Sequence, residues 1–296
     1  MKVVIIGYGH AGRAYVSACR NLSAITEIFV VDVNQAVRSD VPHGVNFATR
    51  LPPCRFDLAI IATPPSTHLS VLESVIEKAK RFILEKPFAV AAEDLNSLFN
   101  LATIGSIFFS IHARYGEEVL MGRRTIQPLL PMSEIKVSQL YCDPYWPNGP
   151  KNLGGPFWDS IFNALGVVNA IFDDIKLSEI EVKADLDNFL DIEAQGTCQE
   201  GVLQYRLCVD WRRALNLKVT EVTDPGRHNG VLINHSQQCV SALSGLTFEH
   251  YPFSDARLTA HYKSVVHECI TTDSLLENNR MARLISDQVL QIEALR

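Results

Sequence analysis

Three glycines near the N-terminus have a spacing that suits phosphate binding. Residues 7–12 read Gly-Tyr-Gly-His-Ala-Gly, after the apolar run Val3–Ile6 and before a helix expected over Ala14–Leu22. In that context the first glycine permits a tight turn, the second lets the backbone approach a pyrophosphate, and the third allows close helix–strand packing. The helix N-terminus adds free N–H groups and a positive dipole end. We therefore predict dinucleotide binding by Gly7, Tyr8, Gly9, His10, Ala11 and Gly12.

An acidic residue follows this loop at a matching distance. Asp32 lies twenty residues beyond Gly12, at the end of the second predicted strand. Its carboxylate can accept hydrogen bonds from the ribose hydroxyls of the adenosine and would repel a 2′-phosphate. NAD is therefore the expected cofactor, in preference to NADP. The alternative explanation is an ordinary aspartate in a turn at a strand end.

A second polar pair lies in the middle of the chain. Asp159 and Asn163 are four residues apart in a helix expected over Asp159–Phe172, so both side chains share one face. Helix capping alone could explain Asp159. Asn163 is a poor helix former in a helix interior, and the flexible pair Gly154 and Gly155 precedes the helix. The pair is therefore predicted to form a polar site.

The first 115 residues alternate short apolar runs with helical patterns. Continuous β-branched and apolar runs are typical of strands that are buried on both faces of a parallel sheet. Helices are expected from Ser66 or Thr67 to Ala79 and around Leu95–Ala102. This alternation implies right-handed crossovers and a doubly wound Rossmann domain over residues 1–115. The predicted strands are Val3–Ile6, Ile28–Val31, Leu58–Ile61, Phe82–Leu84 and Ile107–Phe109.

Residues 116–296 have a different pattern. Apolar and polar residues alternate in several segments, which predicts an α+β domain with a mostly antiparallel, open sheet. Asp224–Gly226 and Asn229–Gly230 are expected to be turns between strands. Helices are expected over Arg257–Ile270 and Ser274–Leu295. The alternating segments are Ile135–Leu140, Ile180–Leu186, Val202–Val209 and Leu215–Val222.

Composition excludes several kinds of partner. The 296 residues are 47% apolar and carry a net charge of -6, which argues against a nucleic-acid partner. The seven cysteines include no CxxC pair, and His261 and His267 do not have metal-ligand spacing, so we expect reduced thiols and no metal site. The run Val3–Ile6 is too short for a signal peptide or a membrane span. We therefore expect a cytoplasmic protein.

The first half of the chain resembles the Gfo/Idh/MocA oxidoreductases at three places. They are the glycine loop, Ala-Thr-Pro-Pro-Ser-Thr-His at 62–68, and the tripeptide Glu85-Lys86-Pro87. The resemblance implies that Lys86 reaches the reacting carbon of the substrate, that Pro87 sets a rigid turn, and that the 62–68 loop borders the cofactor. It also implies dimer or tetramer contacts through the open sheet face and a last helix, 274–295, that returns to the Rossmann domain. Further cofactor contacts implied in this way are Thr63, Pro64, Pro65, His68, Glu85 and Lys86.

A second block, at 153–167, is similar to one subgroup. The common family pattern is a glycine cluster followed by Asp-x-Gly-x-His, and here Asp159 is kept while Asn163 stands at the histidine position. Asparagine followed by Ala-Leu resembles the aldose 1-dehydrogenases that act on galactose or arabinose, as do residues 111–115 and 209–212. Ser160 and Ile161 depart from the family pattern.

The predicted chemistry is hydride transfer from a carbon that bears a hydroxyl group. It needs a group that accepts the hydroxyl proton and a group that accepts the hydride, both held next to the same carbon. Nicotinamide would accept the hydride. Lys86 would orient the hydroxyl and stabilise developing charge, or act as a base, unless it is only a surface lysine. Asp159 could share the proton transfer, and Asn163 would only donate or accept hydrogen bonds. His112 and Trp146 are further candidate substrate contacts, with packing in the core as the alternative.

The function expected from sequence is an NAD(P)-dependent oxidoreductase acting on a small polyhydroxy substrate, an aldose oxidised at carbon one. One alternative is a reductase of another carbonyl or an imine in a biosynthetic pathway. A second alternative is a non-catalytic regulatory protein that senses dinucleotides. Ser160 and Ile161 favour the regulatory protein, whereas the intact Glu85-Lys86-Pro87 argues against it.

Overall fold

A computed structural model of the chain contains two compact units, each built on its own sheet. The first unit comprises residues 1–112 and 258–283, and the second comprises residues 113–257 and 284–296. Helix α8 (Leu275–Glu293) contributes residues to both units. The structure describes residues 1–102, 106–132, 134–143, 154–213, 215–244, 247–253, 257–271 and 275–296.

The sheet of the first unit is entirely parallel and confirms the predicted doubly wound fold. Its strand order is β3-β2-β1-β4-β5-β6, and the order reverses between β1 and β4. Ligands of such sheets bind outside the carboxyl ends of the strands at that reversal. All five predicted strands are present, and β3 is an additional one. The bounds are β1 Lys2–Ile6, β2 Glu27–Val31, β3 Asn46–Ala48, β4 Phe56–Ile61, β5 Ala79–Leu84 and β6 Ile107–Phe109.

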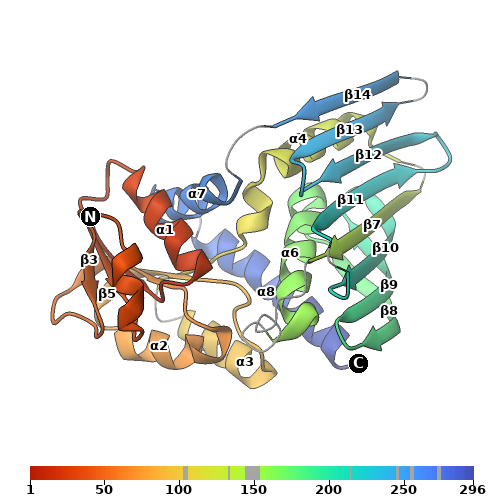
Figure 1. The fold of residues 1–296 in the computed structure, drawn as a ribbon. Coiled ribbons are helices and arrows are strands. Elements are labelled where there is room, and N and C mark those ends of the chain that lie inside the picture. The colour runs from red at the N-terminus through yellow and green to blue at the C-terminus, as the bar shows by residue number, and fades with distance from the viewer. Residues whose placement is uncertain are drawn as a thin grey trace. The chain divides into compact units, whose positions relative to one another are not determined.

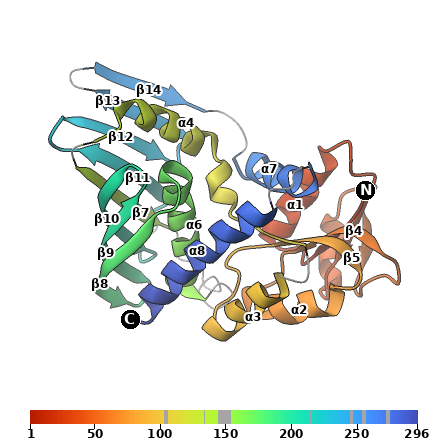
Figure 2. The ribbon, with the colours of Figure 1, turned by 180° about the vertical axis from the view of Figure 1, so that it is seen from behind.

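Helices cover both faces of this sheet. Figures 1 and 2 show α1 and α7 on one side and α2 and α3 on the other. No helix in the described ranges is long and apolar enough to cross a membrane. The helices are α1 His10–Arg20, α2 His68–Val75, α3 Ala92–Ala102 and α7 Arg257–Thr271, with the 3-10 turns η1 Gln35–Asp40, η2 Pro65–Thr67 and η3 His112–Tyr115.

Two helix boundaries in the first unit differ from the sequence prediction. Helix α1 starts at His10 and not at Ala14, because Gly9 already forms its extended N-cap. The predicted helix that reaches Ala79 is wrong after Val75. A turn in which Lys78 N–H donates to Val75 O ends α2, and Ala79 then pairs with Phe56 in the sheet.

The second unit contains an eight-stranded sheet in the order β14-β13-β12-β11-β7-β10-β9-β8. Among the described strands only β10 and β7 pair in parallel, so the mostly antiparallel sheet is confirmed. Helices α4 (Glu117–Ile126) and α6 (Gly155–Phe172) lie against one face (Figure 1). The strands are β7 Ile135–Cys142, β8 Lys176–Leu186, β9 Phe189–Cys198, β10 Gly201–Asp210, β11 Leu217–Asp224, β12 Asn229–Asn234, β13 Cys239–Ser244 and β14 Thr247–Pro252.

One predicted turn in this sheet is wrong. Asn229 and Gly230 begin β12 and pair with Asp224 and Thr223 of β11. The chain reverses before them, where Gly226 N–H donates to the Asp224 side chain at 3.2 Å. The predicted turn at 224–226 does begin this reversal, and the two predicted C-terminal helices correspond to α7 and α8. Ser274, the predicted start of the last helix, lies outside the described residues.

Candidate functional site

The glycine loop follows β1 and leaves an open space at the N-terminus of α1. A Cβ atom on Gly7 would lie 2.5 Å from Ala62 O, and one on Gly12 would lie 2.1 Å from Gly7 O, so close packing requires both glycines. A Cβ on Gly9 would meet no atom of the described residues within 4 Å. The first turn of α1 also has no acidic side chain. This space, with a helix N-terminus beside it, fits the pyrophosphate of a dinucleotide.

The other loop residues differ in what they can offer a ligand. The Tyr8 ring is buried, its hydroxyl donates to Asp40 O at 3.0 Å, and the Arg13 guanidinium lies 4.7 Å from the ring centre. Tyr8 can therefore offer its backbone more readily than its ring. His10 is exposed and Ala11 is half-buried.

Asp32 lies beside this loop at the end of β2. Its Oδ2 accepts from Tyr8 N–H at 2.7 Å and its Oδ1 accepts from Asn34 N–H at 2.8 Å. These bonds fix the carboxylate, while each oxygen retains a second lone pair and the side chain stays partly exposed. The structure thus places Asp32 next to the glycine loop with acceptor capacity left for ribose hydroxyls.

The 62–68 loop follows β4, and the buried side chain of His68 holds it in place. This side chain is 1% exposed, and its ring nitrogens lie 3.0 Å from Phe88 O and 2.9 Å from Thr63 O. Burial lowers the pKa of His68, and the hydrogen bonds with the carbonyls of Phe88 and Thr63 oppose that shift. His68 therefore supports the loop, while Thr63 and Pro64 are at least partly exposed and Pro65 is buried.

Glu85 and Lys86 follow β5 at the same edge of the sheet. Glu85 is 5% exposed, and it accepts from the Tyr15 hydroxyl at 2.8 Å and from the Tyr262 hydroxyl at 3.3 Å. Burial raises the pKa of Glu85, and the adjacent Lys86 charge opposes that rise. Lys86 itself is half-buried. The carboxyl ends of β1, β2, β4 and β5 thus bring together the glycine loop, Asp32, the 62–68 loop and Lys86.

His112 lies in a buried aromatic group of the first unit. It is 7% exposed, and its ring centre lies 5.1 Å from that of Tyr262 and 6.0 Å from that of His261. This placement agrees with the alternative of a core histidine. Trp146, the other candidate substrate contact, lies outside the described residues.

Asp159 and Asn163 lie on the one stripe of α6 that is not buried. Every residue of this helix is buried except Gly155, Pro156, Asp159 and Asn163. These positions share one face because they repeat at helical spacing. The N-cap is Gly154, and Asp159 is the fifth helical residue, so the capping explanation of Asp159 is wrong. The second unit thus presents a carboxylate and an amide together on the partly exposed stripe of α6.

The two departures from the family pattern point into the core of the second unit. Ser160 is 1% exposed and its Oγ accepts from Trp211 Nε1 at 3.1 Å, while Ile161 is fully buried. Neither side chain belongs to the partly exposed stripe. The hydrogen bond from Trp211 to Ser160 holds α6 in place next to Asp159. The sequence does not reveal this contact, because the two residues are 51 positions apart and no motif links them.

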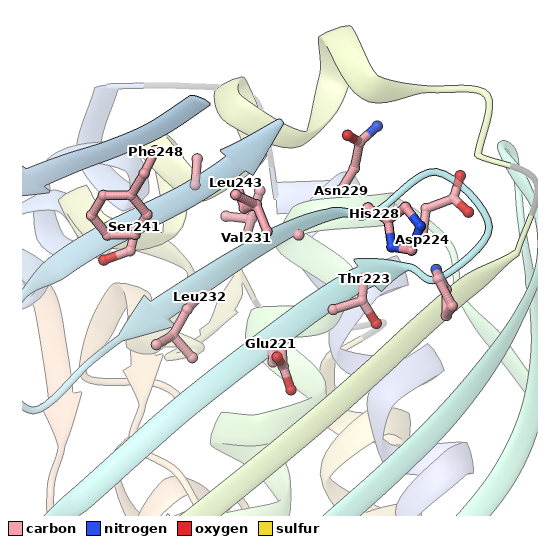
Figure 3. A pocket seen from close by; sticks show the side chains of 13 residues that line it. Glu221, Thr223, Asp224, His228, Asn229, Val231, Leu232, Ser241, Leu243 and Phe248 are labelled. Carbon is pink, nitrogen blue, oxygen red and sulfur yellow. The ribbon is translucent and has the colours of Figure 1, made fainter. Parts of the chain in front are cut away.

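A separate hollow of about 450 Å³ lies on the outer face of the second sheet, over β11 to β14. Leu232, Leu243 and Phe248 line it and are 40%, 42% and 67% exposed (Figure 3). It contains none of the predicted site residues. Its exposed apolar side chains are typical of a surface that binds another protein.

Comparisons with known proteins agree with the fold of the first unit. Residues 1–109 match the model of the Gfo/Idh/MocA oxidoreductase family, described as having an NAD-binding Rossmann fold. One curated relative, the UDP-N-acetylglucosamine 3-dehydrogenase of Acidithiobacillus ferrooxidans, is 28% identical over 108 residues, which are 34% of this chain and 33% of that protein. The chain thus matches about a third of the length of this relative.

Solved structures extend the likeness of the fold beyond the Rossmann domain. A dehydrogenase from Chromobacterium violaceum has a TM-score of 0.76 at 11% identity, covering 98% of this chain and 93% of the other. A levoglucosan dehydrogenase in complex with NADH and levoglucosan has a TM-score of 0.73 at 14% identity, covering 98% and 96%. At these identities the likeness shows the fold alone.

Proposed function

We propose that this protein is an NAD-linked dehydrogenase that oxidises a hydroxyl carbon of a small cyclic sugar or polyol. The observation that carries the proposal is the set of groups at the carboxyl edge of the first sheet: an open phosphate cradle at Gly9, the fixed carboxylate of Asp32, and Lys86 beside the buried Glu85. The named relatives, which act on sugars, support the substrate class.

In the first unit, separate groups of residues would bind the cofactor and act on the substrate. The glycine loop and the N-terminus of α1 bind the pyrophosphate, and Asp32 binds the adenosine ribose. Thr63 and Pro64 border the cofactor, on a loop that His68 holds in place. When bound, the nicotinamide supplies the hydride acceptor. Lys86 orients the reacting hydroxyl and stabilises the negative charge that develops on its oxygen.

We assign substrate binding in the second unit to the exposed stripe of α6. Asp159 can accept hydrogen bonds from substrate hydroxyls and can accept a proton, whereas Asn163 cannot titrate and can only donate and accept hydrogen bonds. Ser160 and Ile161 lie off this stripe, so their departure from the family pattern does not remove a polar group from it.

Variants of the stripe should impair turnover and spare stability. Asn163→Ala should raise KM about tenfold, because a lost hydrogen bond to substrate is worth roughly 1 kcal/mol or more and a half-exposed amide adds little packing. Asp159→Asn should lower kcat as well, since it keeps the shape and removes the charge. Paired melting and rate measurements test both. Unchanged kinetics together with a lowered melting temperature would assign the pair a structural role.

Asp32 should make the protein prefer NAD over NADP. Its carboxylate at the end of β2 would repel a 2′-phosphate. Asp32→Ala should therefore weaken NADH binding and reduce the difference in affinity between NADH and NADPH. Fluorescence titrations of both cofactors at moderate salt measure this. Tighter binding of NADPH than of NADH by the unaltered protein would contradict the assignment.

A substrate panel tests the proposed function. Free aldoses, cyclic polyols, anhydrosugars and nucleotide sugars are incubated with NAD, and NADH formation is followed. Our first candidate is an aldose oxidised at carbon one, for which the product is a lactone. The name of the UDP-N-acetylglucosamine 3-dehydrogenase also favours a ring hydroxyl at another position. Activity only with NADH and carbonyl or imine substrates would favour the reductase. Cofactor binding without any turnover would favour the sensing protein.

We also propose that the outer face of the second sheet packs against a second copy of the chain. The exposed side chains of Leu232, Leu243 and Phe248 are the apolar part of that face (Figure 3). Sedimentation measurements should then find a homodimer or homotetramer.

All seven cysteines are free, which suits a reducing compartment such as the cytoplasm.

A further inference from the structure

Glu85 is a buried carboxylate whose two oxygens are each bound by a different tyrosine. Tyr15, on α1, donates to Oε2 at 2.8 Å, and Tyr262, on α7, donates to Oε1 at 3.3 Å. Both tyrosine side chains are themselves buried. A buried carboxylate is costly unless hydrogen bonds satisfy it, and donors on both oxygens favour its ionised form.

The position of Tyr262 is fixed by contacts on several sides. Its ring centre lies 4.4 Å from that of Tyr15 and 5.1 Å from that of His112. Further along α7, by about two turns, the carbonyl of Cys269 accepts from the Arg81 guanidinium of β5. The contact between Tyr262 and Glu85 joins residues 177 positions apart in the chain. Helix α7 is therefore anchored both to β5 and to Glu85, which directly follows that strand.

We propose that Tyr262 is a positioning residue, which with Tyr15 holds the Glu85 carboxylate ionised beside Lys86 and so maintains the charge and orientation of that lysine. The part played by Lys86 rests on the proposed function, whereas the effect of Tyr262 on Glu85 does not. Helix α7, far from the Rossmann segment in the sequence, thereby becomes part of the catalytic apparatus of the first unit.

The groups around Glu85 determine the direction of the expected effect. Burial raises the pKa of Glu85, and Lys86 together with the hydroxyls of Tyr15, Ser110 and Tyr262 lowers it. Ser110 reaches the same cluster through its hydroxyl, 2.8 Å from the Tyr15 hydroxyl. Outside the cluster, His112 faces Tyr262, and the His261 ring lies 6.0 Å from that of His112. Removing the Tyr262 hydroxyl takes away one group that lowers the Glu85 pKa, so Glu85 should bind a proton at higher pH.

The test compares Tyr262→Phe with Tyr205→Phe. Both remove one hydroxyl from a buried ring, but Tyr205 lies in the second unit and donates to Gln139 Oε1 at 2.7 Å, away from the proposed site. The Glu85 carboxyl is titrated by carbon NMR of glutamate-labelled protein, with Glu85→Gln for assignment. Tyr262→Phe should increase the proton affinity of Glu85 about tenfold, since a hydrogen bond to a charged group is worth roughly 1.5 kcal/mol or more. Tyr205→Phe should leave it unchanged.

Turnover provides the second readout on the best substrate found. Tyr262→Phe should lower kcat about tenfold and move the acidic limb of the rate profile to higher pH, with NADH affinity unchanged. An unchanged Glu85 titration, or equal kinetic losses in Tyr205→Phe, would overturn the proposal. If the unaltered protein oxidises no sugar, the proposed function fails, and the NMR titration still decides whether Tyr262 holds Glu85 ionised.

Discussion

Lys86→Ala should lower kcat by on the order of 100-fold or more while leaving NADH affinity nearly unchanged. One positioned cation that stabilises charge only in the transition state is worth several kcal/mol, and its loss appears in kcat. The lysine follows β5, where the proposed function places the reacting hydroxyl, whereas the open space at Gly9, the proposed pyrophosphate site, belongs to the β1–α1 turn. Steady-state rates and fluorescence titration of NADH measure the two quantities separately.

Lys80→Ala is the matched control for this variant. Lys80 lies on β5, the strand that Lys86 follows, its side chain is 78% exposed, and it forms a surface ion pair with Asp57 at 2.7 Å. Such a pair contributes little to stability, so this variant should retain activity. Activity of Lys86→Ala within a few-fold of the unaltered protein would remove Lys86 from the reaction.

His235→Ala should destabilise the second unit by about 3 kcal/mol, because it removes a hydrogen-bond donor from the buried Glu118 carboxylate. His235 and Glu118 are each 1% exposed, and Nδ1 lies 3.2 Å from Oε1. On the other side of the ring, Nε2 lies 2.9 Å from the Thr220 hydroxyl, which in turn accepts from Gln139 Nε2 at 3.0 Å. Because Gln139 Nε2 can only donate, Thr220 can give its own hydrogen to Nε2, and Nδ1–H then donates to Glu118.

Urea denaturation measures this loss, and Glu277→Ala is its control. Glu277 forms an exposed ion pair with Arg280 three residues away on α8, so its loss should change the free energy of unfolding by less than about 0.5 kcal/mol. A loss below about 1 kcal/mol in His235→Ala would show that the buried pair contributes little to the second unit.

The parallel sheet and the glycine loop between β1 and α1 can be predicted because their signals are local. A β-branched run, three spaced glycines and a following aspartate lie within 32 residues, and in that order they are typical of a strand, a tight turn, a helix and a second strand. The antiparallel sheet is harder to predict. Strand β9 does alternate, with Leu190, Ile192 and Ala194 buried, but the alternation includes the small residues Ala194 and Gly196 and is weak. Strand β14 is exposed at five of its six positions and gives no period-two signal.

The parts of the site that sequence does not reveal depend on contacts between distant residues. Tyr262 reads as an ordinary core position in an amphipathic helix, and only the fold brings its hydroxyl to Glu85. From the sequence alone, Ser160 and Ile161 suggest a weakened site, because they depart from the family pattern. In the structure both side chains lie in the core, which the pattern alone does not tell. The capping explanation of Asp159 fails because the helix begins four residues earlier, at Gly155. Pro156 lies in its first turn, where proline is favourable.

The most direct test of the central claim follows one hydrogen atom from substrate to cofactor. The best sugar from the panel is prepared with deuterium on the carbon that is oxidised, and the NADH formed is analysed by mass spectrometry. Hydride transfer between the two bound molecules predicts that the NADH carries the deuterium and that turnover slows with the labelled sugar. NADH without deuterium, or no NADH from any member of the panel, would contradict the assignment of this protein as a sugar or polyol dehydrogenase.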